Sequence, residues 1–81
     1  MEKQFFVKTD DGYIVIPHNP KMKLNQLKTL IEEKRKYHRN AYYLVANGRP
    51  LYEDLPIEEF KIDVDSTVFV NIRSHWQKPI K

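Results

Sequence analysis

The chain has 81 residues, 14 Lys and Arg against 11 Asp and Glu, a net charge of +3, and no cysteine. This length predicts a single domain close to the lower size limit for a core without staples. The lack of cysteine excludes disulfides and thiolate metal sites. No apolar stretch exceeds about five residues, which excludes a membrane span and a signal peptide among these residues. We expect a monomeric cytoplasmic or nuclear domain that needs no cofactor.

The first two predicted elements are strands that form a hairpin. Residues 4–9 and 13–16 alternate in polarity, and the turn Asp10-Asp11-Gly12 separates them. Alternation directs one set of side chains toward a core, namely Phe5, Val7, Ile14 and Ile16. It directs the other set to the opposite face, namely Phe6, Tyr13 and Val15.

A helix is predicted next, because apolar residues recur at the spacing of one helical face: Leu24, Leu27, Leu30 and Ile31. Its start is poorly capped, since Lys23 occupies the position where Ser, Thr or Asp is preferred. The basic residues 34–36 suit the last turn, and Glu32 and Lys36 have the spacing of a favourable ion pair.

The C-terminal half predicts a second hairpin, a helical turn and a last strand. Residues 42–46 form a strand that ends at Asn47-Gly48, a strong hairpin turn signal. Residues 49–51 form a short edge strand, because Pro50 cannot donate to a sheet. Residues 55–60 predict one helical turn, and residues 66–73 predict a strand with three inward side chains: Val68, Val70 and Ile72. The order is β-β-α-β-β-(turn)-β, an α+β fold with one mixed sheet and a helix packed across it.

From Phe5 to Arg73, the chain resembles ubiquitin and the ubiquitin-like domains. Each matching segment is weak alone, but their order and spacing together are specific. The resemblance implies a β-grasp fold over residues 1–73, followed by a tail or the start of a linker over residues 74–81. The segments are Phe5-Phe6-Val7-Lys8-Thr9, Leu24…Leu27-Lys28…Ile31, Leu44-Val45-Ala46-Asn47-Gly48-Arg49-Pro50-Leu51, Glu53-Asp54, Ile57…Phe60…Ile62 and Ser66-Thr67-Val68.

The tail departs from the family pattern. Conjugated members end in Gly-Gly just after the last strand, where this chain reads Ser74-His75-Trp76-Gln77, and no glycine follows Gly48. A tryptophan is the opposite of the thin thread that enters activating enzymes. We therefore expect a domain that is not conjugated to other proteins.

The family's usual partner surface is an apolar patch on the open face of the sheet. The resemblance places Val45 at its centre and Gly48 in the neighbouring turn, with Phe69 replacing a histidine. Asp10-Asp11 replaces a leucine of that patch. The other partner-binding positions that the resemblance indicates are Tyr43, Arg49, which replaces a lysine used for chain building, and Asn71, which replaces a valine.

The first hairpin, the basic helix end and the histidines each allow a functional and a simpler interpretation. Phe6, Tyr13 and Val15 suggest a second patch, or cross-strand pairs that only stabilise the hairpin. The basic residues at 34–39, with Tyr37 among them, suit contact with RNA or phosphates, or form a solvated helix end. His18, His38 and His75 lack the spacing of metal ligands.

The sequence thus predicts a non-enzymatic interaction domain, the N-terminal module of a larger protein in the ubiquitin–proteasome pathway. The resemblance implies partners such as proteasomal receptors, deubiquitinases or ligases, or another domain of the same protein. Nucleic acid is not the expected partner. The alternatives are an RNA- or membrane-associated scaffold that uses the basic helix end, a domain that binds a small GTPase, or a free modifier whose mature C-terminus is not part of these residues.

Overall fold

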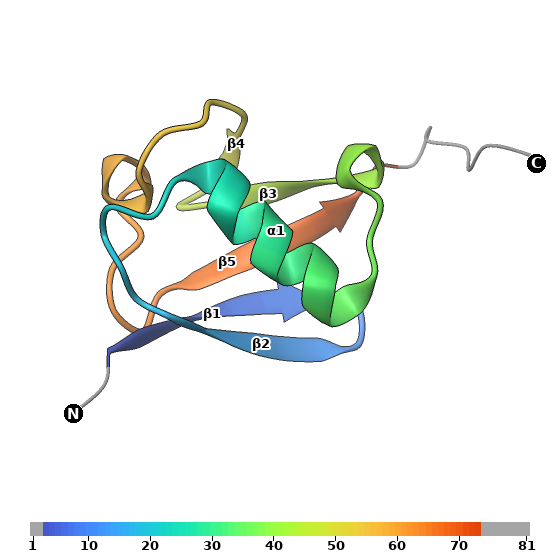
Figure 1. Cartoon of the computed structure of the whole chain (residues 1–81), viewed down its shortest axis with the longest axis horizontal. Coiled ribbons are helices and arrows are strands. Elements are labelled where there is room, and N and C mark those ends of the chain that lie inside the picture. Colours follow the sequence, from blue (N-terminus) through green and yellow to red (C-terminus); the bar gives the residue numbers. More distant parts are fainter. Residues whose placement is uncertain (1–2, 74–81) are drawn as a thin grey trace, which may run out of the picture.

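The computed structural model describes residues 3–73, which form a five-stranded sheet with one helix packed across it (Figure 1). This confirms the predicted β-grasp architecture and element order, and adds one short 3-10 turn before the third strand. The tail with Trp76 and His75 lies outside the described residues. The elements are β1 Gln4–Thr9, β2 Gly12–Pro17, α1 Leu24–Arg35, η1 Arg39–Ala41, β3 Tyr42–Ala46, β4 Arg49–Leu51, η2 Ile57–Phe60 and β5 Thr67–Ile72.

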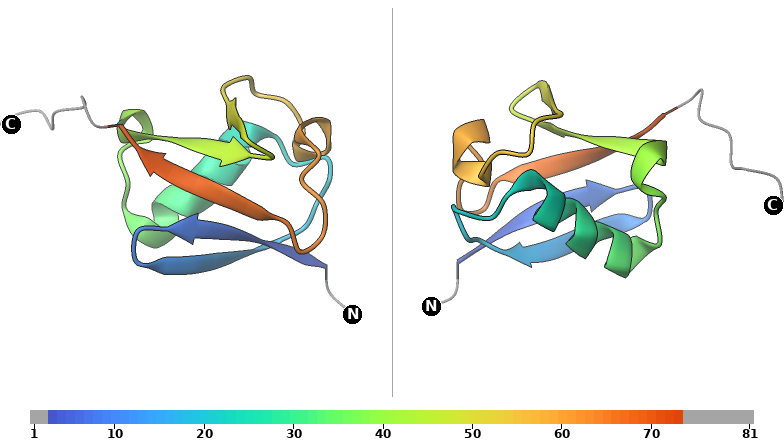
Figure 2. Two further views of the ribbon diagram at one scale, coloured as in Figure 1. Left: turned by 180° about the vertical axis from the view of Figure 1, so that it is seen from behind. Right: turned by 45° about the horizontal axis from the view of Figure 1, so that its top comes forward.

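The sheet has the strand order β2-β1-β5-β3-β4. The central pair β1 and β5 is parallel, and the other neighbours are antiparallel. The short strand β4 lies at an edge, as the proline in it predicts. Seen from behind, the face of the sheet opposite α1 carries no other element of the described chain (Figure 2). The fold therefore leaves one sheet face open.

The core lies between α1 and the inner face of the sheet. The four inward positions predicted for the first hairpin are buried, as are Leu24, Leu27 and Ile31 on the helix, whereas Leu30 is half-buried. Each fully buried apolar side chain of this size contributes about 1.5–3 kcal/mol relative to its exposed state. The buried set is Phe5, Val7, Ile14, Ile16, Leu24, Leu27, Ile31, Tyr42, Leu44, Ala46, Leu51, Ile57, Ile62 and Val68.

The prediction for the end of the last strand is wrong at Ile72. Val68 is buried and Val70 is half-buried, but Ile72 is 51% exposed. It pairs with Tyr42 of β3 at the end of β5, beyond the residues Thr67–Phe69 that pair with β1. Alternation gives the face on which a side chain lies, and the neighbouring elements decide whether that side chain is buried.

Distant and local groups together cap the start of α1. Lys23 makes no side-chain cap, as expected, but the Gln26 side chain accepts the Lys23 N–H at 3.0 Å. Asp54, far along the chain, accepts the Asn25 N–H at 2.9 Å. A carboxylate at this end also favours the helix dipole. The helix start is therefore stabilised by a residue that local sequence does not reveal.

The helix ends at Arg35, and Lys36 takes the left-handed conformation (φ 61°) while its N–H bonds the Glu32 carbonyl at 2.8 Å. The expected Glu32–Lys36 pair is therefore wrong. The Glu32 carboxylate instead accepts a hydrogen bond from Arg39 at 2.9 Å and one from the Tyr42 hydroxyl at 2.7 Å. This places Glu32 at the junction between α1, η1 and β3.

Candidate protein-interaction surface

Strands β3 and β5 bring together four of the residues predicted to bind partners. In β3, Tyr43 and Val45 alternate with buried neighbours and point away from α1. The register pairs Val45 with Phe69 and Tyr43 with Asn71. Since directly paired residues share a face of the sheet, these four side chains lie side by side on the open face. Phe69 is 48% exposed, which is high for a phenylalanine in a central strand.

The register also joins this group to the predicted second patch. Lys8 of β1 pairs with Phe69 on one side and with Tyr13 of β2 on the other. Val45, in turn, pairs with Pro50 of the edge strand. One row of side chains therefore crosses all five strands, and the two patches form a single open face. We call this row together with Tyr43, Asn71, Phe6 and Val15 the sheet face.

Tyr52 and Arg73 extend this surface beyond the residues predicted from the sequence. The Tyr52 ring lies 6.3 Å from the Tyr43 ring, and the Arg73 guanidinium lies over the Tyr43 ring at 5.4 Å. Tyr52 is 64% exposed. Each lies two residues beyond a sheet-face position, Pro50 or Asn71, so strand alternation was the signal that locates them.

The Asn47-Gly48 turn borders the sheet face. Both residues have positive φ, 54° and 78°, as the tight hairpin turn requires. The Asn47 side chain donates to the carbonyl of Phe60 at 3.0 Å and to that of Lys61 at 3.1 Å. The turn is therefore held against η2, and the space beside Gly48 is open to a partner.

Arg49 lies apart from the sheet face. It pairs with Ala46, whose side chain is buried on the helix side of the sheet. It lines a pocket of about 470 Å³ between β4 and η2, together with Phe60 and Asp63. Of the predicted partner-binding residues, Arg49 is the one that the register places on the other side.

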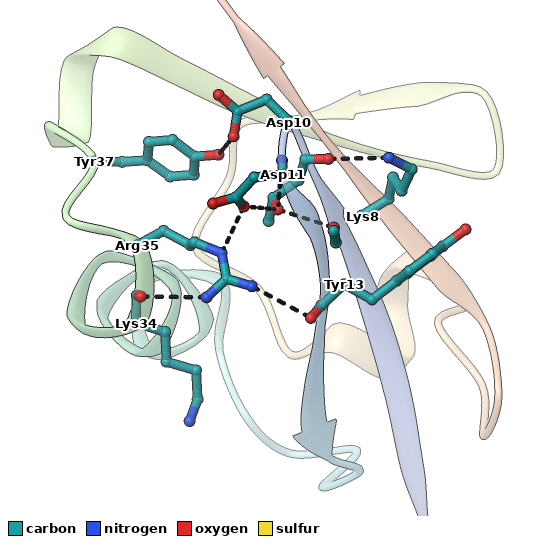
Figure 3. A network of polar contacts seen from close by, with 9 residues as sticks. Lys8, Asp10, Asp11, Tyr13, Lys34, Arg35 and Tyr37 are labelled. Atoms are coloured by element: carbon teal, nitrogen blue, oxygen red, sulfur yellow. Dashed lines mark hydrogen bonds and ion pairs between the residues drawn. The ribbon is translucent and has the colours of Figure 1, made fainter.

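The acidic tip of the first hairpin is tied to the end of α1 (Figure 3). The Tyr37 hydroxyl donates to Asp10 Oδ1 at 2.8 Å. Arg35 Nε donates to Asp11 Oδ1 at 3.0 Å, and its Nη2 donates to the Tyr13 carbonyl at 3.4 Å. The two residues that replace the family's leucine thus bond to the helix side, and they leave the border of the sheet face.

These contacts shift two pKa values. The Thr9 hydroxyl, 2.9 Å from Asp11, and the Arg35 guanidinium lower the pKa of the Asp11 carboxyl. Burial and the hydrogen bond to Asp10 raise the pKa of the Tyr37 hydroxyl. Near neutral pH the tip therefore holds an ionised Asp11 and a neutral Tyr37.

The basic helix end is partly neutralised by its own surroundings. Arg35 pairs with Asp11, and Arg39 pairs with Glu32 at 2.9 Å while its Nη2 donates to Thr29 at 3.0 Å. The hydrogen bonds that Arg39 donates to the Glu32 carboxylate raise the pKa of Arg39. Two of the cations in this segment thus serve the fold.

His18 is held by the fold, through one polar contact and one ring contact. The His18 ring nitrogen Nε2 lies 2.8 Å from the Ile62 carbonyl, and its ring meets Phe5 edge-on at 5.9 Å. His75 lies outside the described residues. Within residues 3–73, no group of His, Asp and Glu is placed to hold a metal ion, and no helix is long and apolar enough to cross a membrane.

Comparison with known proteins agrees with this architecture. A search of the curated proteins gives no significant match. The sequence model of the Ubiquitin family matches residues 5–75. This range contains α1 and all five strands, apart from the first residue of β1. Domains of this family are generally non-enzymatic modules. The match and the five-stranded β-grasp sheet lead to one conclusion: the chain belongs to the ubiquitin family.

Proposed function

We propose that this chain is a non-conjugated ubiquitin-like interaction domain that docks ubiquitin-recognising proteins through the sheet face. The single observation that carries the proposal is the row that crosses the sheet at Phe69, with Val45 beside it. An exposed Phe69 beside the half-buried side chains of Tyr43 and Val45 makes an apolar cluster on an open face, and such clusters mark interaction sites in soluble proteins. The partner classes are proteasomal receptors, deubiquitinases, ligases or another domain of the same protein, and the setting is the ubiquitin–proteasome pathway in the cytoplasm or nucleus.

The sequence after β5 supports the absence of conjugation. Trp76 follows closely on Arg73, in the stretch where conjugated members carry Gly-Gly. A bulky indole does not pass where a glycine thread is required. Incubation of the full chain with ubiquitin-activating enzyme and ATP is expected to give no thioester, with ubiquitin as the positive control. A thioester with this chain would overturn this part of the proposal.

Docking is tested by titrating the ¹⁵N-labelled chain with a ubiquitin-binding motif peptide and with a proteasomal receptor domain. We expect chemical-shift changes at Tyr43, Val45, Gly48 and Phe69. The change Phe69→Ala should weaken binding about tenfold or more, since an aromatic anchor at the centre of an interface contributes about 2 kcal/mol.

The matched control is Val64→Ala, which truncates a similarly exposed apolar residue in the loop before β5. It should leave the affinity within about twofold of the parent chain, as for most residues outside a hot spot. Equal losses for the two variants, or shifts that map to α1, would contradict docking through the sheet face.

A further inference from the structure

The part of the sheet face near β2 forms a shallow groove, and none of the residues at which docking is expected to change chemical shifts lines it. The groove has a volume of about 430 Å³. Its lining combines apolar and aromatic side chains with one carboxylate: Phe6, Tyr13, Val15, Asp65 and Thr67. We infer that this groove binds a lysine or arginine side chain of a partner protein, with the aliphatic stem on Phe6 and Val15 and the cation at Asp65.

Asp65 is positioned firmly at one end of the groove. It has the left-handed conformation (φ 66°), and its N–H donates to the Gln4 carbonyl at 2.7 Å. Within residues 3–73, no lysine or arginine forms an ion pair with its carboxylate. The backbone thus holds an exposed negative charge that the described part of the chain does not neutralise.

The opposite end of the groove is cationic. Lys8 Nζ lies over the Tyr13 ring, 5.4 Å from its centroid, and also donates to the Thr9 carbonyl at 3.1 Å. A second cation at that end would be repelled, whereas a cation at the Asp65 end would be attracted. The two charges therefore give the groove a direction, and a basic side chain fits it in one orientation.

The dimensions agree with a lysine or arginine stem. Phe6 pairs with Val15 and Thr67, so these three side chains form the floor. Asp65 bonds Gln4, two residues before Phe6, which places it about 7 Å along the strand. An extended lysine side chain reaches about 6 Å from its Cα to its ammonium nitrogen. The stem therefore spans the apolar floor as its head reaches the carboxylate.

A purely apolar occupant suits the groove less well. It would take the Asp65 carboxylate out of water without a partner, and an unpaired charge removed from water is costly. A basic side chain covers the same apolar floor and supplies that partner. Charge complementarity thus selects Lys or Arg over an aliphatic side chain of similar length.

The test uses NMR titration of the ¹⁵N-labelled full chain with N-acetyl-lysine methylamide, and with the norleucine analogue, which lacks the charge. We expect saturable shifts at Phe6, Val15, Asp65 and Thr67. The lysine compound should bind about two- to fivefold more tightly than the norleucine compound, the range expected for an exposed ion pair.

The decisive variant is Asp65→Asn, because asparagine tolerates the left-handed conformation and keeps the backbone in place. It should abolish the preference for the lysine compound. The matched control, Asp63→Asn, makes the same charge change at a residue that lines the pocket on the other side of the loop, and should preserve that preference.

Equal binding of the two compounds, loss of the preference in both variants, or no saturable shift would overturn the inference. Chemical-shift changes at the groove residues that depend on protein concentration alone would also overturn it. They would indicate that a second copy of the chain occupies the groove. Phe69→Ala should not affect the lysine compound, since Phe69 does not line the groove. The lysine compound thus tests the groove alone, and a negative result with it is distinguishable from a negative result in the docking titration.

Discussion

On the helix side of the sheet, three cations pair with carboxylates and Lys28 lies over the Tyr42 ring at 5.9 Å, whereas on the open side of the sheet Lys8 and Arg73 lie over aromatic rings and pair with no carboxylate of the described chain. Three ion pairs lie around α1, η1 and η2 in the described chain, and all of them are away from the sheet face: Lys21–Glu58, Arg35–Asp11 and Arg39–Glu32. On the sheet face, Lys8 lies over Tyr13 and Arg73 over Tyr43, both at 5.4 Å.

We therefore expect the two sides to differ in role, with the helix side serving stability and the sheet face serving the proposed docking. On the helix side, polar side chains bond to one another. No buried side-chain nitrogen or oxygen within residues 3–73 lacks a hydrogen-bond partner. The sheet face keeps exposed rings and cations that carboxylates of the described chain do not neutralise. A substitution on the helix side should therefore cost folding energy, and one on the sheet face should cost binding energy.

The largest expected effect compares Leu27→Ala with Phe69→Ala. Leu27 is fully buried on α1, so its truncation removes apolar contacts and leaves a cavity. We expect a loss of about 2–5 kcal/mol in the free energy of unfolding. Phe69→Ala should cost about 1 kcal/mol or less, since half of the ring is already in water.

Urea denaturation of the two variants, followed by circular dichroism, measures both losses. Similar losses would show that the rings of the sheet face stabilise the fold as much as the core does. The separation of the two faces would then fail.

Local sequence patterns were enough to predict the helix and every strand. Alternation gave the buried residues of the first hairpin, and Asn47-Gly48 gave the turn whose positive φ values the structure shows. The alternation did not predict the exposure of Ile72, because the neighbouring elements decide whether that side chain is buried. Sequence spacing also suggested Lys36 as the partner of Glu32, because it contains no information on where Arg39 and Tyr42 fold back.

The candidate site was only partly predictable for a related reason. The resemblance identified Val45 and Phe69 but could not show that Lys8 links them to Tyr13, because strand register is a long-range property. It grouped Arg49 with them, although cross-strand pairing places that residue on the helix side. Whether these residues bind a partner stays a prediction.

The next largest effect concerns Tyr42, the buried link between β3 and α1. Its hydroxyl donates to Glu32 at 2.7 Å, so Tyr42→Phe removes a charge-assisted hydrogen bond while keeping the ring. We expect a loss of about 1–2 kcal/mol in the free energy of unfolding near neutral pH. Tyr43→Phe, on the sheet face, is the matched control and should change the free energy of unfolding by about 0.5 kcal/mol or less.

The same variant tests a pH dependence. Burial and the bond to Glu32 raise the pKa of Tyr42 above its ordinary value of 10.0. Its stabilising contribution is therefore fully present below pH 10 and declines as the pH rises further, because the unfolded tyrosine ionises first. Urea denaturation between pH 8 and 11 should show a steeper loss in the parent chain than in Tyr42→Phe. Parallel curves would contradict the raised pKa.

A smaller effect of opposite sign is expected at Lys36, where α1 ends. Its left-handed backbone (φ 61°) suits glycine, which carries no penalty from a Cβ in that conformation. Lys36→Gly should raise the free energy of unfolding by about 0.5–1 kcal/mol. Lys34→Gly, within the last turn of α1, should lower it by about the same amount. Thermal melts of both variants test the pair, and a loss of stability in both would contradict the cap geometry.

The smallest effect concerns the tip of the first hairpin, where Asp11 bonds Thr9 and Arg35. Because its pKa is lowered from 3.8, its contribution to stability is present above that pH and is lost as the pH falls through the lowered value. Thr9→Val and Arg35→Gln should each raise the pKa of Asp11, since the Thr9 hydroxyl and the Arg35 guanidinium both lower it. A carboxyl ¹³C titration of both variants measures the two shifts. An unchanged pKa in Arg35→Gln would mean that the turn itself, and not the tie to the end of α1, sets the charge at this border of the sheet face.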